Sequence, residues 1–110
     1  MNSVHDFGGM QCYGPVIHDN GGEPTFRHDW ERRTFAIHLL VQLEGMMCGD
    51  ECRHEMEKMN PVHYLESAYY EHWMHATEML LLSKGILTQQ ELDSRTQALK
   101  FQEATDAAYA

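Results

Sequence analysis

Apolar residues recur at helical spacing along most of the chain from residue 29 onward. The first such stretch has a broad apolar face formed by Phe35, Ile37, Leu39, Leu40, Val41 and Leu43. Gly45 follows it, and a glycine just past the last turn commonly ends a helix. A second, shorter helix is predicted over about residues 49–59, with Asp50 and Glu51 near its positive N-terminal end.

Two further helices are predicted after Asn60-Pro61, which supplies a favoured N-cap and a well-tolerated first helical residue. The longest helix is expected over about residues 62–84, and Lys84-Gly85 ends it. A capping-box sequence at residues 88–91 then opens a more polar helix over about residues 88–105. Because no strand signal appears, the pattern predicts an all-α fold with about four helices in a domain of residues 29–110.

Residues 1–28 differ from the rest of the chain. They hold five of the eight glycines and two of the three prolines, and neither a helical nor a strand period runs through them. A disordered solvating tail rarely has as many large apolar side chains as this segment, which carries Phe7, Met10, Tyr13, Val16, Ile17 and Phe26. We expect an extended arm that lies on a partner chain. The alternatives are a loop folded back on its own domain and an unordered terminus.

Composition narrows the possible function classes. The 110 residues include 8 Lys+Arg against 17 Asp+Glu, which gives a net charge of −9. This deficit of basic residues argues against nucleic-acid binding and against a polybasic membrane patch. No apolar run approaches the roughly 20 residues of a membrane span. Without a signal-peptide pattern, and with three cysteines that make no disulfide framework, the expected location is the cytoplasm.

Cysteine, histidine and glutamate residues form only parts of known metal sites. Cys48 and Cys52 are four residues apart with His54 nearby, but no second ligand pair follows. Glu51-x-x-His54 is half of a di-iron motif, and His72-x-x-His75 does not complete it. We therefore interpret the last two histidines as surface or partner-contacting residues. Nucleotide-binding loops and a nucleophile elbow are absent, so the sequence shows no catalytic set for an enzyme acting alone.

Arg53 lies among apolar residues of the predicted second helix. Periodicity alone favours a surface arginine that pairs with Glu57 four residues later. A second cluster contains Tyr69, Tyr70 and Trp73, which cannot all face one core. Some of these aromatic side chains are therefore expected to face a partner or a pocket.

Several non-adjacent motifs occur in one order along residues 1–95. They are His5-Asp6-Phe7-Gly8-Gly9-Met10, Tyr13-Gly14-Pro15-Val16, Glu23-Pro24, Asp29-Trp30-Glu31, Arg53-His54, Met59-x-Pro61-x-His63-Tyr64-Leu65-Glu66, Tyr69-Tyr70-Glu71-His72-Trp73 and Lys84-Gly85-Ile86-Leu87-Thr88. Together they resemble the N-terminal half of the nitrile hydratase β subunit. In that family the β subunit continues into a second half. The resemblance therefore implies a three-chain type of enzyme, in which a separate chain is equivalent to the C-terminal half of β.

The resemblance implies a hetero-oligomeric lyase that converts a small-molecule nitrile to an amide. A non-corrin cobalt(III) or iron(III) ion would be bound by a C-x-x-C-S-C claw in an α-type partner. That claw is absent from this sequence, so we expect no metal ligand from this chain. Arg53 would hydrogen-bond the oxidised cysteine oxygens of the partner, and Tyr69 would position the substrate or its water.

The resemblance also assigns walls of a substrate pocket. Phe35 and Trp73 would line it, while Gly49 and Cys52 stand where larger apolar residues are usual. A pocket widened in this way would suit a bulky nitrile such as a nucleoside. Cys12 stands at a position that is commonly glycine, and we have no functional account of that change.

Two alternatives stay open at this point. Thiocyanate hydrolase has a similar β subunit, and its products would be carbonyl sulfide and ammonia. Nitrile hydratase activator proteins, which are small metallochaperones, resemble the same half of β but typically lack the complete His-Asp-x-Gly-Gly arm. This chain keeps that arm at residues 5–9.

Overall fold

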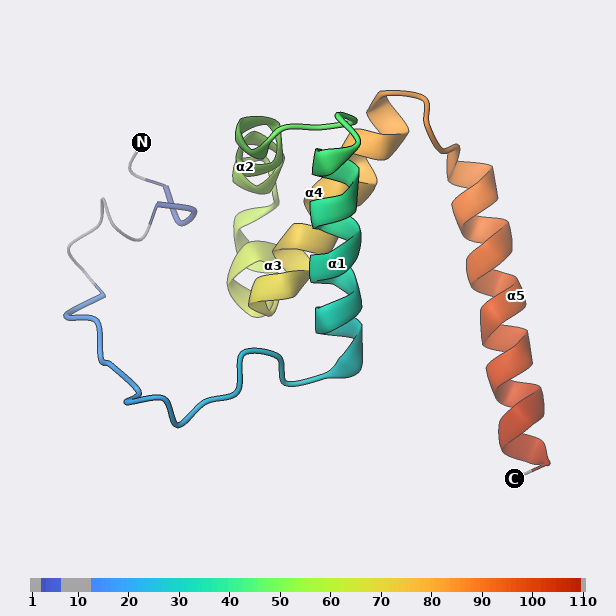
Figure 1. Ribbon diagram of the computed structural model, residues 1–110, viewed down its shortest axis with the longest axis horizontal. Helices are drawn as coiled ribbons and strands as arrows, with labels where there is room; N and C mark the ends of the chain where they lie inside the picture. The colour runs from blue at the N-terminus through green and yellow to red at the C-terminus, as the bar shows by residue number, and fades with distance from the viewer. Residues whose placement is uncertain (1–2, 7–12, 110) are drawn as a thin grey trace. The chain divides into compact units, whose positions relative to one another are not determined.

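A computed structural model describes residues 3–6 and 13–109 of the chain. Its helices are α1 (Asp29–Leu43), α2 (Gly49–Glu57), α3 (Pro61–Glu66), α4 (Tyr69–Ser83) and α5 (Gln89–Ala108), as Figure 1 shows. The described residues contain no strand, so the predicted all-α class is confirmed. The glycine-rich part of the arm at residues 7–12, including Cys12, lies outside the described residues.

The chain divides into two compact units, residues 1–80 and residues 81–110. The first unit contains α1, α2, α3 and most of α4, and its apolar core is formed by Met47, Cys52, Ala76 and Leu80. Val41 and Met56 pack against this core. The second unit contains the end of α4 and the whole of α5, a helix with no buried residue. The expected domain boundary after residue 28 stays a prediction.

The prediction of one long helix over residues 62–84 is wrong, because the structure divides this segment into α3 and α4. Ser67 ends α3 in an extended conformation, with φ of −83° and ψ of 149°. Its hydroxyl donates a hydrogen bond to the carbonyl of His63, so it competes with the backbone bonds of a continuous helix. The backbone N–H of Ala68 then donates to the Glu71 carboxylate, which caps the start of α4.

Glycine ends two helices as the sequence predicts. Gly45 follows α1 with a φ of +75°, and Gly85 follows α4 with a φ of +71°. The next residue in each case donates its N–H to a carbonyl five residues back: Met46 to Val41 and Ile86 to Leu81. These bonds form Schellman motifs, which need a left-handed residue that glycine adopts without a steric penalty. The two predicted stops are confirmed.

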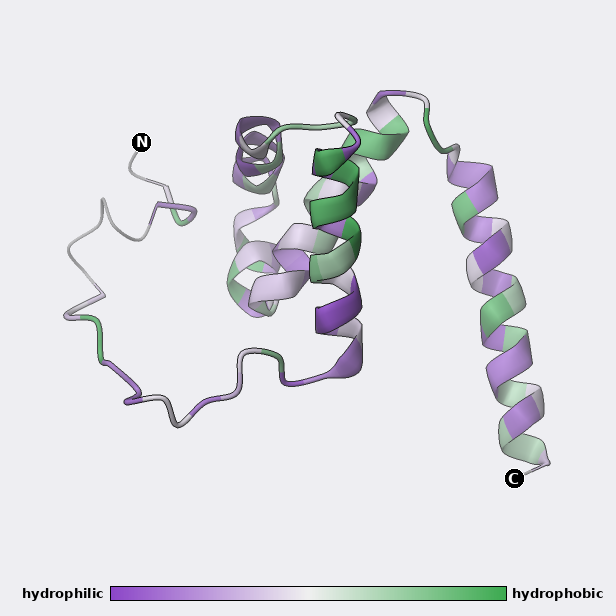
Figure 2. Ribbon diagram, in the orientation of Figure 1, coloured by the Kyte–Doolittle hydropathy of each residue, from purple (hydrophilic) through white to green (hydrophobic). Residues whose placement is uncertain are grey.

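The buried face of α1 differs from its most apolar face. Glu31, Thr34 and His38 are buried, while Leu40 and Leu43 are 59% and 81% exposed. Figure 2 shows that the apolar residues of α1 concentrate toward its C-terminal end. Helical spacing therefore predicted the helix, but its fully buried positions are polar. Of the apolar residues, Phe35 and Val41 are half-buried and pack against the rest of the unit.

The buried carboxylate of Glu31 is satisfied by the chain just before α1. It accepts hydrogen bonds from the backbone N–H groups of Arg27 and His28, the second at 2.9 Å. These groups are among the donors that a helix leaves unpaired at its N-terminus. Burial of this charge is therefore compensated by local backbone donors.

The described parts of the arm also contact the helical region through the rings of His5 and Phe26. His5 Nε2 is 2.9 Å from the carbonyl oxygen of Met59, and its ring packs edge-on against Tyr64. Phe26 packs against Phe35 and Tyr70, with ring centroids 5.6 and 5.3 Å apart. Between these contacts, residues 13–25 form no helix or strand and their side chains are exposed. The proposed placement of the arm on a partner chain stays a prediction.

Among the helices that the structure describes, none has the length and apolar character needed to cross a membrane.

Asn60 provides a local test of the turn between α2 and α3. Its Oδ1 accepts hydrogen bonds from the backbone N–H groups of Val62 and His63, at 3.0 and 3.3 Å. We expect Asn60→Ala to lower the free energy of unfolding by about 1 kcal/mol, because both donors lose their cap. Asn60→Asp keeps the acceptor and should lose much less. Chemical denaturation measures both variants, and equal losses in the two would contradict this role.

Candidate functional site

Helices α1, α2 and α4 surround a cavity of about 270 Å³, which we call the Arg53 cavity. Its lining residues are His38 and Gln42 of α1, Gly49, Cys52, Arg53 and Met56 of α2, and Tyr69 and Trp73 of α4. Five of the six site residues predicted from the sequence therefore lie around one cavity. The sixth, Phe35, is not part of the lining and packs behind Trp73, with ring centroids 5.8 Å apart.

Helix α2 contributes half of the lining because of its spacing. Cys52 and Arg53 lie three and four residues after Gly49, and Met56 lies four and three residues after them, so the four residues share one face of the helix. A Cβ atom at Gly49 would meet Gln42 Oε1 at 3.9 Å, which is an ordinary contact. Glycine is therefore not required here by crowding, and its effect is to leave space in the cavity.

Cys52 belongs both to the cavity wall and to the core. Its side chain is 2% exposed, and its Sγ lies 3.3 Å from Met47 Sδ. Cys48, four residues earlier, is exposed. In residues 3–6 and 13–109, no three His, Cys, Asp or Glu side chains are grouped so that they could hold a metal ion.

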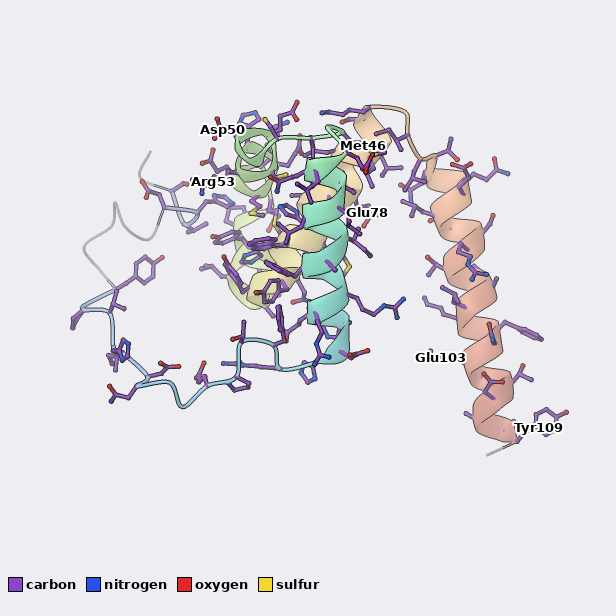
Figure 3. The ribbon with its side chains drawn as sticks, viewed as in Figure 1. Met46, Asp50, Arg53, Glu78, Glu103 and Tyr109 are labelled. Atoms are coloured by element: carbon purple, nitrogen blue, oxygen red, sulfur yellow. The ribbon has the colours of Figure 1, made fainter. Side chains whose placement is uncertain are left out.

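Arg53 is exposed at the cavity and projects from α2, as Figure 3 shows. The ion pairs found among the described residues join Arg27 to Glu23, Arg32 to Asp29 and Lys58 to Glu55. None of these includes Arg53, so the pairing with Glu57 that periodicity favours is not found there. The guanidinium keeps its fork of donors available for an oxygen-rich group.

The aromatic cluster is divided between core and cavity, as expected from its sequence. Tyr70 is 9% exposed and Tyr69 is 63% exposed, while the exposure of Trp73 is intermediate. The rings of Tyr69 and Trp73 lie 5.8 Å apart in an edge-on arrangement. Burial raises the pKa of the Tyr70 hydroxyl, and the neighbouring Tyr69 and Glu31 raise it further. Tyr70 therefore supports the cavity wall, whereas Tyr69 presents its side chain to the opening.

His38 is a cavity residue that the sequence analysis missed. It is 4% exposed, and its Nδ1 lies 3.0 Å from the Thr77 hydroxyl of α4. Its ring also packs against Trp73, with centroids 4.4 Å apart. A signal was present in the sequence, because His38 and Gln42 are polar residues four apart within an otherwise apolar stretch.

The interpretation of His72 as a surface or partner-contacting residue is wrong. His72 is 9% exposed, its Nε2 lies 2.9 Å from the Tyr64 carbonyl oxygen, and its ring stacks on that of Tyr64 at 4.1 Å. It therefore joins α4 to α3 as a structural residue. His75 is half-buried, with its ring 6.2 Å from that of His63.

A larger hollow of about 470 Å³ lies where the arm meets α1 and α4, and Tyr69 is the one predicted site residue that borders it. Its arginine and glutamate side chains are already partnered. Arg27 pairs with Glu23 at 2.9 Å, and Glu31 and Glu71 accept backbone hydrogen bonds. The smaller Arg53 cavity therefore has the groups better suited to chemistry.

A family model described as the N-terminal region of the nitrile hydratase beta subunit matches residues 1–109. The chain is 46% identical over 92 residues to the nitrile hydratase subunit beta of Pseudomonas putida, covering 84% of this chain and 42% of that protein. It is 42% identical over 97 residues to the low-molecular weight cobalt-containing nitrile hydratase subunit beta of Rhodococcus rhodochrous, covering 88% of this chain and 42% of the relative.

The cobalt-containing nitrile hydratase subunit beta of Pseudonocardia thermophila is 41% identical over 97 residues, covering 88% of this chain and 41% of the relative. The chain thus spans less than half the length of the curated relatives that it matches.

Burial lowers the pKa of His38 below its ordinary value of 6.5. The unfolded chain therefore binds the proton more readily than the folded chain. The free energy of unfolding consequently decreases as the pH falls through 6.5 toward the lower folded-state pKa. We expect His38→Asn to reduce this loss between about pH 7.5 and about pH 5, as chemical denaturation would measure. His54→Asn, at an exposed histidine of α2, is the matched control. An unchanged pH dependence in His38→Asn would contradict the assignment.

Proposed function

We propose, because this chain belongs to the nitrile hydratase beta-subunit family, that it forms part of the substrate site of a hetero-oligomeric enzyme that converts a nitrile to an amide. One observation carries the proposal: Arg53, Tyr69, Trp73, Gly49 and Cys52 surround the same cavity. These residues come from two helices, and the resemblance had assigned them to one site. In this proposal the chain is a non-metal, β-type subunit of a lyase.

Arg53 is the residue that we assign to the reacting centre. Its guanidinium is exposed at the cavity and enters no ion pair with the described residues. A planar fork of N–H donors suits two oxygens held close together, and such charge-assisted bonds are strong. We propose that Arg53 donates to the oxygens of oxidised cysteines in the claw of an α-type partner.

The other cavity residues define the space for the substrate. Tyr69 carries the hydroxyl that would position the nitrile or its water, and Trp73 supplies an aromatic wall that Phe35 supports from behind. Gly49 and Cys52 contribute little side-chain volume, which supports a wide pocket. A closed assembly with the partner would exclude water from this space and so strengthen the hydrogen bonds made there.

The metal in this proposal is a cobalt(III) or iron(III) ion bound by the α-type partner. When bound there, it would supply Lewis-acid activation of the nitrile or of water. Two relatives are named as cobalt-containing, which favours cobalt. The contribution of this chain is to orient groups around that centre through Arg53 and Tyr69.

Replacement of Arg53 tests its role directly. Arg53→Lys keeps the positive charge but cannot form the two parallel hydrogen bonds of a guanidinium. We expect kcat/KM for a nitrile to fall about 100-fold in the assembled enzyme, as for loss of one preorganised electrostatic donor. Metal content and subunit stoichiometry should remain unchanged.

Arg32→Lys is the matched control, because Arg32 lies on the exposed surface of α1, where it is 3.9 Å from Asp29. It should retain wild-type turnover. Near-normal turnover in an assembled, metal-loaded Arg53→Lys enzyme would exclude the proposed role. Hydration of organic nitriles without turnover of thiocyanate would also separate the proposal from the thiocyanate hydrolase alternative.

Native mass spectrometry with metal analysis tests the assembly. We expect the chain to co-purify at equal stoichiometry with a partner that carries a C-x-x-C-S-C claw, with about one cobalt or iron ion per pair. Release of the chain once the partner holds its metal would instead indicate an activator protein. The expectation that a separate chain corresponds to the C-terminal half of β is tested by the same spectrum.

A further inference from the structure

His38 is the side chain in the Arg53 cavity that the proposed function leaves unused. It reaches the cavity from α1, opposite the residues that α2 contributes. Its Nδ1 lies 3.0 Å from Thr77 Oγ1, and the Thr77 hydroxyl lies 2.9 Å from the carbonyl oxygen of Trp73. These three groups form a continuous hydrogen-bonded chain between α1 and α4.

The donor-to-acceptor direction of these hydrogen bonds determines which imidazole nitrogen of His38 carries the proton. The carbonyl of Trp73 can only accept, so the Thr77 hydroxyl must donate its single proton to it. The same hydroxyl oxygen therefore accepts from His38, and the donor is Nδ1–H. In a neutral imidazole the other nitrogen, Nε2, then carries a lone pair and acts as an acceptor. Burial lowers the pKa of His38, which favours this neutral form.

The Nε2 atom is available to a ligand. Among the described residues, the polar contact of His38 is the one to Thr77 through Nδ1. No fully buried side-chain nitrogen or oxygen in the same part of the chain lacks a hydrogen-bond partner. An unpartnered Nε2 must therefore be reached by solvent, and the space that His38 borders is the Arg53 cavity.

We propose that His38 determines substrate specificity by accepting, at Nε2, a hydrogen bond from an N–H or O–H group of the nitrile substrate. This inference rests on the proposed function. A nitrile nitrogen can only accept hydrogen bonds, so it is matched to a donor such as the Tyr69 hydroxyl. An uncharged acceptor in the same space has no partner on the nitrile group itself. It is matched by a donor elsewhere on the substrate.

Thr77 is a positioning residue in this arrangement. Its hydroxyl selects the Nδ1–H form of His38, although Thr77 does not line the cavity itself. Loss of that hydroxyl would remove the acceptor for Nδ1–H and allow the proton to move to Nε2, where it would block the acceptor. A site built to receive a substrate donor discriminates against analogues that lack it, because the polar atom is then left unpaired.

Matched pairs of substrates test the proposal in the assembled enzyme. The ortho, meta and para isomers of aminobenzonitrile are each compared with the methylbenzonitrile of the same substitution, which replaces the N–H donor by a group of similar size. We expect wild type to prefer the amino compound in at least one pair. His38→Leu should reduce that kcat/KM ratio about tenfold, the effect expected for one hydrogen bond in a closed site.

Substitutions at Thr77 test whether the position of the proton on His38, rather than packing alone, sets the substrate preference. Thr77→Val should reduce the same ratio, whereas Thr77→Ser keeps the hydroxyl and should retain it. Nitrogen NMR of the His38 imidazole should show the proton on Nδ1 in wild type and in Thr77→Ser, and should show its loss from Nδ1 in Thr77→Val. This measurement applies even if His38→Leu fails to assemble.

The possible results distinguish failure of this inference from failure of the proposed function. A ratio unchanged in His38→Leu, including an equal fall for both members of the pair, would overturn the inference, because His38 would then act on a step common to all nitriles. A proton on Nε2 in wild type would also overturn it. If the wild-type complex hydrated no nitrile at all, the proposed function would fail and this inference with it. Hydration of both without a preference would remove this inference alone.

Discussion

The hydrogen-bonded chain from His38 through the Thr77 hydroxyl to the Trp73 carbonyl joins α1 to α4, the two 15-residue helices. His38 and Thr77 are both buried, so the Nδ1–H group and the hydroxyl that meet between the helices need hydrogen-bond partners there. This requirement allows the helices to meet in few ways. Trp73 lies next to His38 as a result, and the cavity wall follows from that contact.

The first unit has a small apolar core beside this polar contact. Met47, Cys52, Ala76 and Leu80 form the core, while Ile37, Leu39, Leu40 and Leu43 of α1 remain exposed. Short domains bury a limited share of their surface, and large apolar groups left outside commonly mark places where another protein binds. The arrangement is consistent with a chain whose proposed function depends on a partner subunit.

The surroundings of the Arg53 side chain cannot be inferred from its own helix. Local spacing on α2 offers Glu57 as its partner, but the side chain lies instead at a cavity bordered by α1 and α4. Resemblance to a family directed attention to Arg53, Tyr69 and Trp73, and the three residues line one cavity. It did not identify His38, because the significance of that residue comes from the orientation of a hydroxyl group on α4.

Features that depend on neighbours in the chain could be predicted from the sequence alone. These include the all-α class, the ends of helices at Gly45 and Gly85 and the cap at Asn60, because their hydrogen bonds join residues within a few positions of each other. The break at Ser67 was missed because a serine side chain can either continue or interrupt a helix. Only the tertiary structure decided that the His38 face of α1 is buried and that Nδ1 is the nitrogen that meets Thr77. Both depend on Thr77, which is 39 residues away and reaches His38 only after α1 and α4 have packed.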